Sequence, residues 1–304
     1  MIRWFAALLA LALAACAPAQ TAALEQGRFV EWERIVPEGL PDQRVTIWLP
    51  EGYDTSERRY RVLYMHDGHN LFDLENSNFQ KIWEADTAML KLVRDEVIEP
   101  HIIVGIWAPG EDRYRQYLPQ FVEEQARGDL AASMRENTMG RPVVSARYLE
   151  WIADELKPRI DTEYRTRSGA QDTAIMGSSM GGIMSCYAIA ARPDVFGKAG
   201  CVSSHWPIAL PAEAEREQAT RIWTNWFAEN LGEPKGRRIW MDHGTATLDA
   251  YYPPYQAAVD EAFEQAGWIR GQDFESRSYE GAEHDENAWA DRLPEILTWL
   301  LSER

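Results

Sequence analysis

Short apolar runs alternate along this chain with longer segments of helical periodicity. Runs rich in Val, Ile and Met predict buried strands, and apolar residues three or four positions apart predict amphipathic helices. We expect strands at 28–35, 43–49, 61–65, 101–107, 173–176, 198–202, 238–242 and 274–279, and helices at 83–97, 145–160, 183–191, 212–231, 255–266 and 287–301. This alternation predicts an α/β fold with a mostly parallel sheet covered by helices on both faces.

Two regions depart from the alternation. The strands at 28–35 and 43–49 are separated by prolines and a glycine, which predicts an antiparallel pair at the start of the domain. Residues 113–140 are polar and irregular, so we expect an insertion over the site or a mobile loop there. The length of residues 27–304 is that of one large domain.

Residues 177–182 read Gly-Ser-Ser-Met-Gly-Gly and join a predicted strand to a predicted helix. This is the context that a G-x-S-x-G nucleophile elbow requires. The turn is tight, so side chains two residues before or after the serine would collide, and glycine stands at both places. The pattern predicts a nucleophilic Ser179 at the partly positive end of a helix. The alternative is a Gly/Ser turn that only connects two elements.

A serine nucleophile needs a histidine base and an acid, which follow it along the chain in the order acid, histidine. Of the six histidines, only His284 lies in the loop after the last predicted strand. Asp242 and Asp249 are the candidates for the acid. We favour Asp249, because its loop can reach across to His284, whereas Asp242 is close to the strand itself.

An oxyanion hole needs two backbone N–H groups. We expect one from Met180, the residue after the serine, and one from His69, where Gly68 lets the backbone bend. His66 and His69 could also suggest a metal site, but no third ligand has suitable spacing, so we predict no metal and no cofactor.

The chain carries 31 basic and 48 acidic residues, a net charge of −17. This argues against nucleic acid or an anionic membrane surface as partner, and it disfavours strongly anionic substrates without a local basic pocket. Thirteen tryptophans indicate mainly core packing, but aromatic side chains near the carboxyl edge of the sheet could stack on rings. Our candidates for this are Tyr114, Tyr117, Trp206 and Trp289.

The N-terminus predicts export from the cytoplasm. Arg3 and the apolar residues 5–15 form a signal too short to span a bilayer. Residues 13–16, Leu-Ala-Ala-Cys, resemble the lipobox of bacterial lipoproteins, which implies removal of residues 1–15 and acylation of Cys16. The alternative is ordinary cleavage after Ala19.

Either route places the mature chain in the cell envelope, as an outer-membrane lipoprotein or in the periplasm. Residues 16–26 then form a tether, and the lipid is the only membrane contact that we expect. Cys186 and Cys201 lie in apolar segments, and we interpret them as buried thiols.

With these motifs in place, the chain resembles the putative esterase family of α/β-hydrolases. That family includes feruloyl and acetyl-xylan esterases, S-formylglutathione hydrolases, siderophore trilactone esterases and mycolyltransferases. The matching stretches are 64–73, 83–86, Arg113 with Tyr117 and Pro119, 177–182, Gly244-Thr245, Leu248-Asp249 and His284. The resemblance implies the α/β-hydrolase fold, Ser179, Asp249 and His284 as triad, and residues 67–69 as oxyanion loop.

The combined prediction is a lipid-anchored serine carboxylesterase that acts on short or aromatic acyl esters, including esters of carbohydrates. Arg113, Tyr117 and Trp206 are its expected substrate-binding residues. Three alternatives stay open. A siderophore trilactone esterase would need a basic pocket, for which Arg113, Arg115 and Arg141 are the nearby cations. An acyltransferase would use the same acyl-enzyme, and a non-catalytic binding protein could share the fold.

Overall fold

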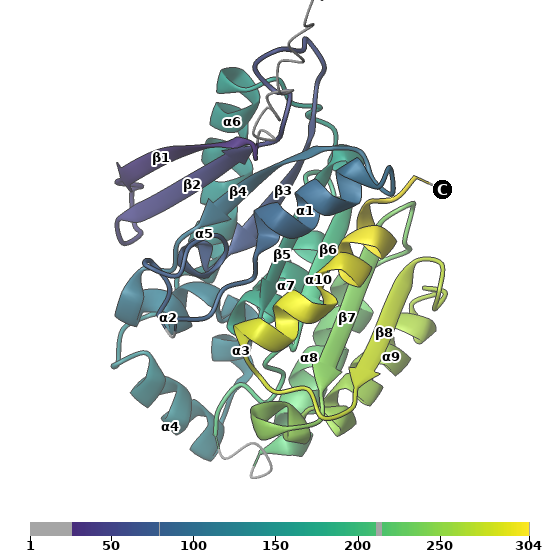
Figure 1. The fold of residues 1–304 in the computed structure, drawn as a ribbon. Helices are drawn as coiled ribbons and strands as arrows, with labels where there is room; N and C mark the ends of the chain where they lie inside the picture. The colour runs from purple at the N-terminus through teal and green to yellow at the C-terminus, as the bar shows by residue number, and fades with distance from the viewer. Residues whose placement is uncertain (1–25, 79, 211–214, 304) are drawn as a thin grey trace, which may run out of the picture.

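The computed structural model describes residues 26–78, 80–210 and 215–303. They form one eight-stranded sheet in the order β1-β2-β4-β3-β5-β6-β7-β8 (Figure 1). The strands are β1 Arg28–Ile35, β2 Gln43–Leu49, β3 Arg61–His66, β4 His101–Ile106, β5 Thr173–Ser178, β6 Lys198–Val202, β7 Arg238–Gly244 and β8 Phe274–Tyr279. β2 pairs antiparallel with β1 and β4, and every later pair is parallel. The predicted mostly parallel sheet and the antiparallel entry pair are therefore confirmed.

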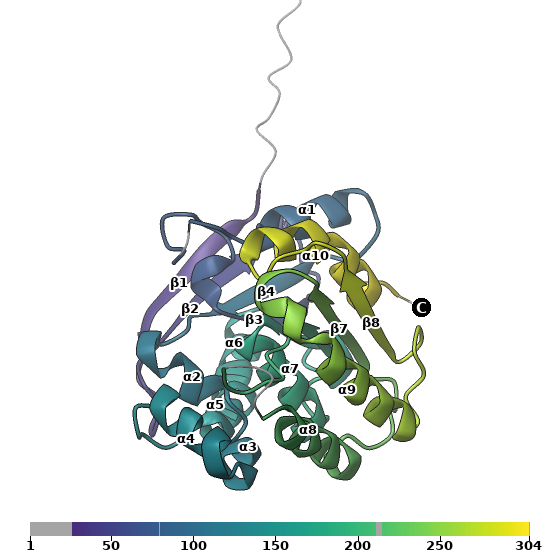
Figure 2. The ribbon, with the colours of Figure 1, turned by 90° about the horizontal axis from the view of Figure 1, so that it is seen from below.

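Helices cover both faces of this sheet. Figure 2 shows α1 and α10 on one face and α7, α8 and α9 on the other. The helices are α1 Ala85–Arg94, α2 Arg113–Tyr117, α3 Gln120–Gln125, α4 Gly128–Asn137, α5 Ser145–Trp151, α6 Lys157–Glu163, α7 Met180–Ala191, α8 Arg216–Asn230, α9 Pro253–Gln265 and α10 Glu286–Leu301. A π-helical turn, Ile152–Leu156, joins α5 to α6. Each face has its own apolar core.

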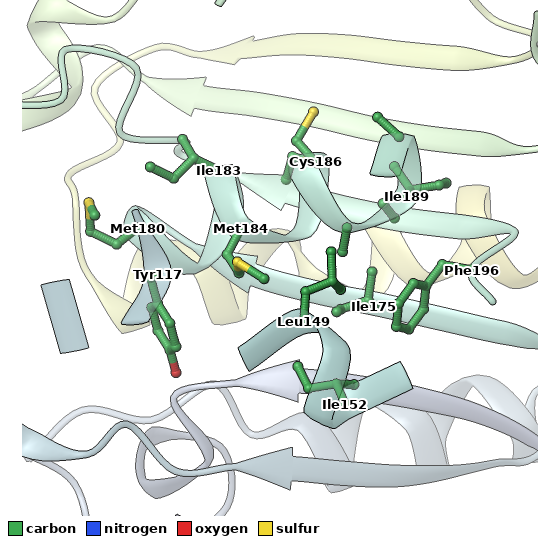
Figure 3. Close-up of a cluster of buried hydrophobic side chains, with 14 of the residues drawn as sticks. Tyr117, Leu149, Ile152, Ile175, Met180, Ile183, Met184, Cys186, Ile189 and Phe196 are labelled. Atoms are coloured by element: carbon green, nitrogen blue, oxygen red, sulfur yellow. The ribbon is translucent and has the colours of Figure 1, made fainter. Parts of the chain in front are cut away.

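Helix α7 is buried almost all round, with ten of its 12 residues inside. Ile183 and Met184 of α7 lie in one apolar cluster with Ile175 of β5 and Leu149 of α5 (Figure 3). A helix that is apolar on every side belongs in a core, where close packing holds it in one position. The element that begins directly after Ser179 is therefore rigid. Cys186 of α7 and Cys201 of β6 are buried free thiols, as predicted.

Residues 113–140 differ from the expected irregular loop. They form the short helices α2, α3 and α4 beside the carboxyl edge of the sheet. Pro119 and Gly128 divide the segment into pieces too short to show helical periodicity. Phe121, Val122 and Leu130 are buried and anchor these pieces to the core.

The predicted signal at 1–15, Cys16 and all of the tether except Gln26 lie outside the described residues. Within the described ranges, no helix combines the length and apolar character needed to cross a bilayer.

Candidate active site

Ser179 sits at a strained turn between β5 and α7. Its backbone has φ 57° and ψ −119°, a region that side-chain-bearing residues rarely occupy. The turn leaves no room on either side: a β-carbon on Gly177 would lie 2.9 Å from the carbonyl carbon of Gly181 and 3.0 Å from Cβ of His66. The Ser179 carbonyl accepts the His205 amide at 3.1 Å. These features match the geometry expected of a nucleophile elbow.

The structure brings His284 and Asp249 together. His284 Nδ1 donates to Asp249 Oδ1 at 2.5 Å, and the His284 amide donates to Thr247 Oγ at 2.8 Å. Asp249 is fully buried. Burial acts to raise the pKa of its carboxyl, but contacts with His284, Ser203 and the Gly244 amide bring that pKa below its ordinary value. Asp249 is therefore an ionised acceptor beside the imidazole.

Ser179 and His284 line one cavity of about 520 Å³. In the described part of the chain, no hydrogen bond joins the Ser179 hydroxyl to the His284 ring. Hydrogen bonds between a nucleophile and its base are often long in free enzymes and tighten when substrate binds. The cavity thus holds the serine, the histidine and the space for a reacting group.

Asp242 has other partners. Its carboxylate accepts Arg292 Nη2 at 2.8 Å, Trp240 Nε1 at 2.7 Å and the Ser203 amide at 3.1 Å. Because these three hydrogen bonds occupy the Asp242 carboxylate, they agree with the preference for Asp249 as the partner of His284.

The loop after β3 differs in one detail from the sequence-based expectation. The left-handed residue is Asp67, with φ 56°, and not Gly68. Gly68 is required for another reason, because a β-carbon there would lie 2.6 Å from the carbonyl carbon of Gly105 in β4. Arg113 donates to both oxygens of Asp67, at 2.7 and 2.8 Å. The pKa of that carboxyl, which burial acts to raise, is lowered by this guanidinium.

The amides of His69 and Met180 are available to a ligand. In the described part of the chain, neither amide donates to a protein oxygen. His69 lines the larger cavity, and Met180 lines a smaller one of about 270 Å³ that also contains Ser179. Free backbone amides in residues that line the cavities at a serine are the donors that an oxyanion hole requires.

The predicted substrate-binding aromatics divide into two groups. Trp206 has no exposed surface, and its indole donates to Gln256 Oε1 at 2.8 Å. Tyr117 is also fully buried, and its hydroxyl accepts the Asp67 amide at 3.2 Å. Neither ring lines a cavity at Ser179, so we withdraw both from the substrate-binding residues. Tyr114 lines the smaller cavity and Trp289 the larger one.

Arg113 lines the larger cavity, as expected, but its guanidinium is already paired with Asp67.

Sequence reasoning missed His205, Tyr252 and Ser203. His205 lines the smaller cavity and pairs through Nδ1 with the Tyr252 hydroxyl at 2.8 Å. Burial lowers the pKa of His205 to about 3, so this ring is neutral. Ser203 donates to Asp249 Oδ2 at 2.6 Å. The only signal in the sequence was their place in the loops that follow predicted strands.

Among the described residues, no three His, Cys, Asp or Glu side chains cluster so as to hold a metal ion.

Comparison with protein families decides the assignment. The family model described as "Putative esterase" matches residues 41–300, most of the chain. The chain belongs to this family. It is an esterase of the α/β-hydrolase type, and the predicted fold class and family are confirmed.

Curated relatives are distant in sequence. The uncharacterized protein YbbA of Bacillus subtilis is 24% identical over 64% of this chain and 70% of its own length. An endo-1,4-beta-xylanase/feruloyl esterase of Xylanibacter ruminicola is 26% identical over 53% of this chain but only 19% of that longer protein.

Solved structures confirm the fold. A ferulic acid esterase superposes with a TM-score of 0.62 at 19% identity, covering 90% of this chain and 98% of that one. The enterobactin esterase FES of Shigella flexneri, crystallised with 2,3-dihydroxy-N-benzoyl-serine, superposes with a TM-score of 0.61 at 17% identity. The match covers 90% of this chain and 59% of that one. At this identity the likeness shows the fold alone.

Proposed function

We propose that this protein is a serine carboxylesterase of the cell envelope that hydrolyses short or aromatic acyl esters through an acyl-enzyme. The decisive observation is one cavity that contains Ser179 on its strained turn and His284 bonded to buried, ionised Asp249. These are the nucleophile, base and orienting acid of acyl transfer.

In this mechanism, Ser179 Oγ attacks the ester carbonyl while His284 Nε2 takes its proton. Asp249 holds Nδ1 protonated and stabilises the imidazolium. The amides of Met180 and His69 receive the oxyanion, and His284 returns the proton to the departing alkoxide. Water, activated by the same histidine, then hydrolyses the acyl-serine.

Ser179 lines two cavities, and each of them binds a different part of the ester substrate. The leaving oxygen must lie near His284, which protonates it, so the alcohol occupies the larger cavity with that histidine. The acyl group then enters the smaller cavity, whose wall includes Ile208, Leu210 and Leu248. A partly apolar space of about 270 Å³ suits a short chain or one aromatic ring.

The charge of the larger cavity favours a neutral alcohol. Among the described residues that line it, both cations are paired with carboxylates, Arg113 with Asp67 and Lys81 with Asp285, and Glu286 adds a third acid. A further cavity of about 420 Å³ shares His69 and contains three aromatic residues, Phe29, Phe72 and Trp107. Aromatic faces beside carboxylates suit a sugar ring better than a polyanion.

Substrate comparison tests this proposal. We expect a higher kcat/KM on methyl ferulate and acetylated sugars than on a ferric siderophore trilactone at matched ionic strength. We also expect Phe29→Ala to raise KM for acetylated xylan while leaving p-nitrophenyl acetate unaffected, because Phe29 lies away from Ser179. A clear advantage for the trilactone would instead support the siderophore esterase, an activity named for one structural neighbour.

Membrane attachment has its own test. Cys16→Ser should prevent acylation, and because several acyl chains hold a protein firmly, only the wild type should sediment with membranes. Ala17 supplies no acidic retention signal, so we expect the outer membrane in a Gram-negative host. Esterase activity per molecule should be equal in both forms. Wild-type protein found free in the periplasm would contradict the anchor.

A further inference from the structure

We propose that Ser203 is a positioning residue of the proposed esterase site, whose hydroxyl is locked as a hydrogen-bond donor to Asp249 by Trp289 and Arg292. This inference rests on the proposed function, because it assigns Asp249 to the triad. Ser203 lies in the loop directly after β6, is fully buried, and touches no reacting atom.

The partners of the Ser203 hydroxyl determine to which of them it donates its hydrogen. Trp289 Nε1 lies 3.1 Å from Ser203 Oγ, and Arg292 Nη2 lies 2.7 Å from it. An indole N–H and a guanidinium can only donate, so together they occupy both lone pairs of the hydroxyl oxygen. The single hydroxyl hydrogen is left with one direction, toward Asp249 Oδ2 at 2.6 Å.

With the Ser203 hydroxyl held in this direction, the two carboxylate oxygens of Asp249 accept hydrogen bonds from different partners. Oδ2 receives the Ser203 hydroxyl at 2.6 Å and the Gly244 amide at 2.6 Å. Oδ1 is thereby directed to His284 Nδ1. Arg292 also pairs with Asp242 at 2.8 Å, and both side chains are buried, so their charges offset each other. The charge that faces the imidazole is that of Asp249.

Removal of the Ser203 hydroxyl should change the basicity of His284. The Ser203 hydrogen bond lowers the pKa of the Asp249 carboxyl. Without it, the carboxylate is less stabilised by its surroundings and pairs more strongly with the protonated imidazole of His284. His284 acts as base only when neutral, so the acid limb of kcat/KM should move to higher pH.

Other ionisable groups near the pair are unchanged in the test. They come from the neighbouring loops and helices: Asp67, Arg113, His205, Asp242, Tyr252, Asp285, Glu286 and Arg292. His205 stays neutral from pH 5 to 9, because its pKa is about 3. Burial raises the pKa of Glu286, but this contribution is common to every variant and cancels in the comparison.

The experiment compares Ser203→Ala with Ser204→Ala by pH profiles of p-nitrophenyl acetate hydrolysis. Ser204 is also fully buried, and among the described residues its hydroxyl has no hydrogen-bond partner, so it is a matched control. We expect Ser203→Ala to lower kcat roughly tenfold, the value of one hydrogen bond to a charged group. We expect its acid limb to shift upward, and the profile of Ser204→Ala to stay that of the wild type.

Ser203→Gly guards against misfolding of the alanine variant. Ser203 has φ 41°, which glycine adopts without strain, so this variant removes the hydroxyl and favours the native backbone. An upward shift in either Ser203 variant supports the lock. An unmoved limb in the folded Ser203 variants, or the same shift in Ser204→Ala, overturns it. Failure of the proposed function is separate, because it would appear as retained activity in Ser179→Ala.

Discussion

Ser179→Ala should reduce kcat for p-nitrophenyl acetate by a factor on the order of 10⁵ to 10⁶, the loss typical when a triad nucleophile is removed. The Ser179 hydroxyl makes a side-chain hydrogen bond with Tyr252, and losing one hydrogen bond between neutral groups costs about 1 kcal/mol. The alanine keeps the β-carbon, and the backbone strain at φ 57° is unchanged. The melting temperature should therefore stay within a few degrees of the wild-type value.

Ser185→Ala is the matched control for this prediction. Ser185 lies in the same helix, is fully buried, and donates only to the Gly181 carbonyl at 2.8 Å. We expect it to keep most of its activity. Mass spectrometry with a fluorophosphonate ester should show one adduct on the wild type and on Ser185→Ala, and none on Ser179→Ala. More than a few per cent of residual activity in folded Ser179→Ala would remove Ser179 from the role of nucleophile.

The turn at Ser179 could be predicted from sequence because it depends on a short pattern, and the contact between Asp249 and His284 because their loops follow two neighbouring parallel strands. At Gly177 the excluding backbone is that of Gly181, within the same five residues, although His66 from the neighbouring strand also limits the space at both glycines. The strands 28–35, 43–49, 198–202 and 274–279 match the structure residue for residue, because proline, glycine or polar turns bound their apolar patterns.

Side-chain direction could not be predicted in the same way. Trp206 and Tyr117 lie at the expected edge of the sheet, but both point into the protein and support other residues. A loop residue has no periodicity from which its orientation can be inferred. The segment 113–140 shows a related limit, since tertiary burial of Phe121 and Leu130 helps to hold helices that are too short to be marked by their own pattern.

One residue of the buried pair Arg292–Asp242 could have been recognised from the sequence. Arg292 falls on the buried stripe of α10, between Trp289 and Ile296 at helical spacing. A cation within an apolar stripe predicts a buried anion opposite it. Its partner Asp242 lies 50 residues earlier in the chain, a distance that no local pattern spans.

Asp249→Asn and Asp242→Asn should separate catalysis from stability. In Asp249→Asn, the amide oxygen should take the place of Oδ2, because the Ser203 hydroxyl and the Gly244 amide both donate there. The amide nitrogen then faces His284 Nδ1 and forces the proton of the imidazole onto Nε2. That tautomer cannot accept the proton of Ser179, so kcat should fall by a factor on the order of 10³ to 10⁴ with the fold retained.

Asp242→Asn should instead lower the stability of the fold strongly and kcat only slightly. Three N–H donors converge on Asp242, so an amide NH₂ would face another donor, and Arg292 would be left buried without its anion. Breaking a buried pair in this way costs about 3–5 kcal/mol of folding free energy. We expect a large fall in the urea midpoint, but less than a tenfold loss of kcat in the folded fraction, since Asp242 does not contact His284. The measurements are urea unfolding and active-site-titrated kcat, and the reverse ranking in kcat would make Asp242 the acid.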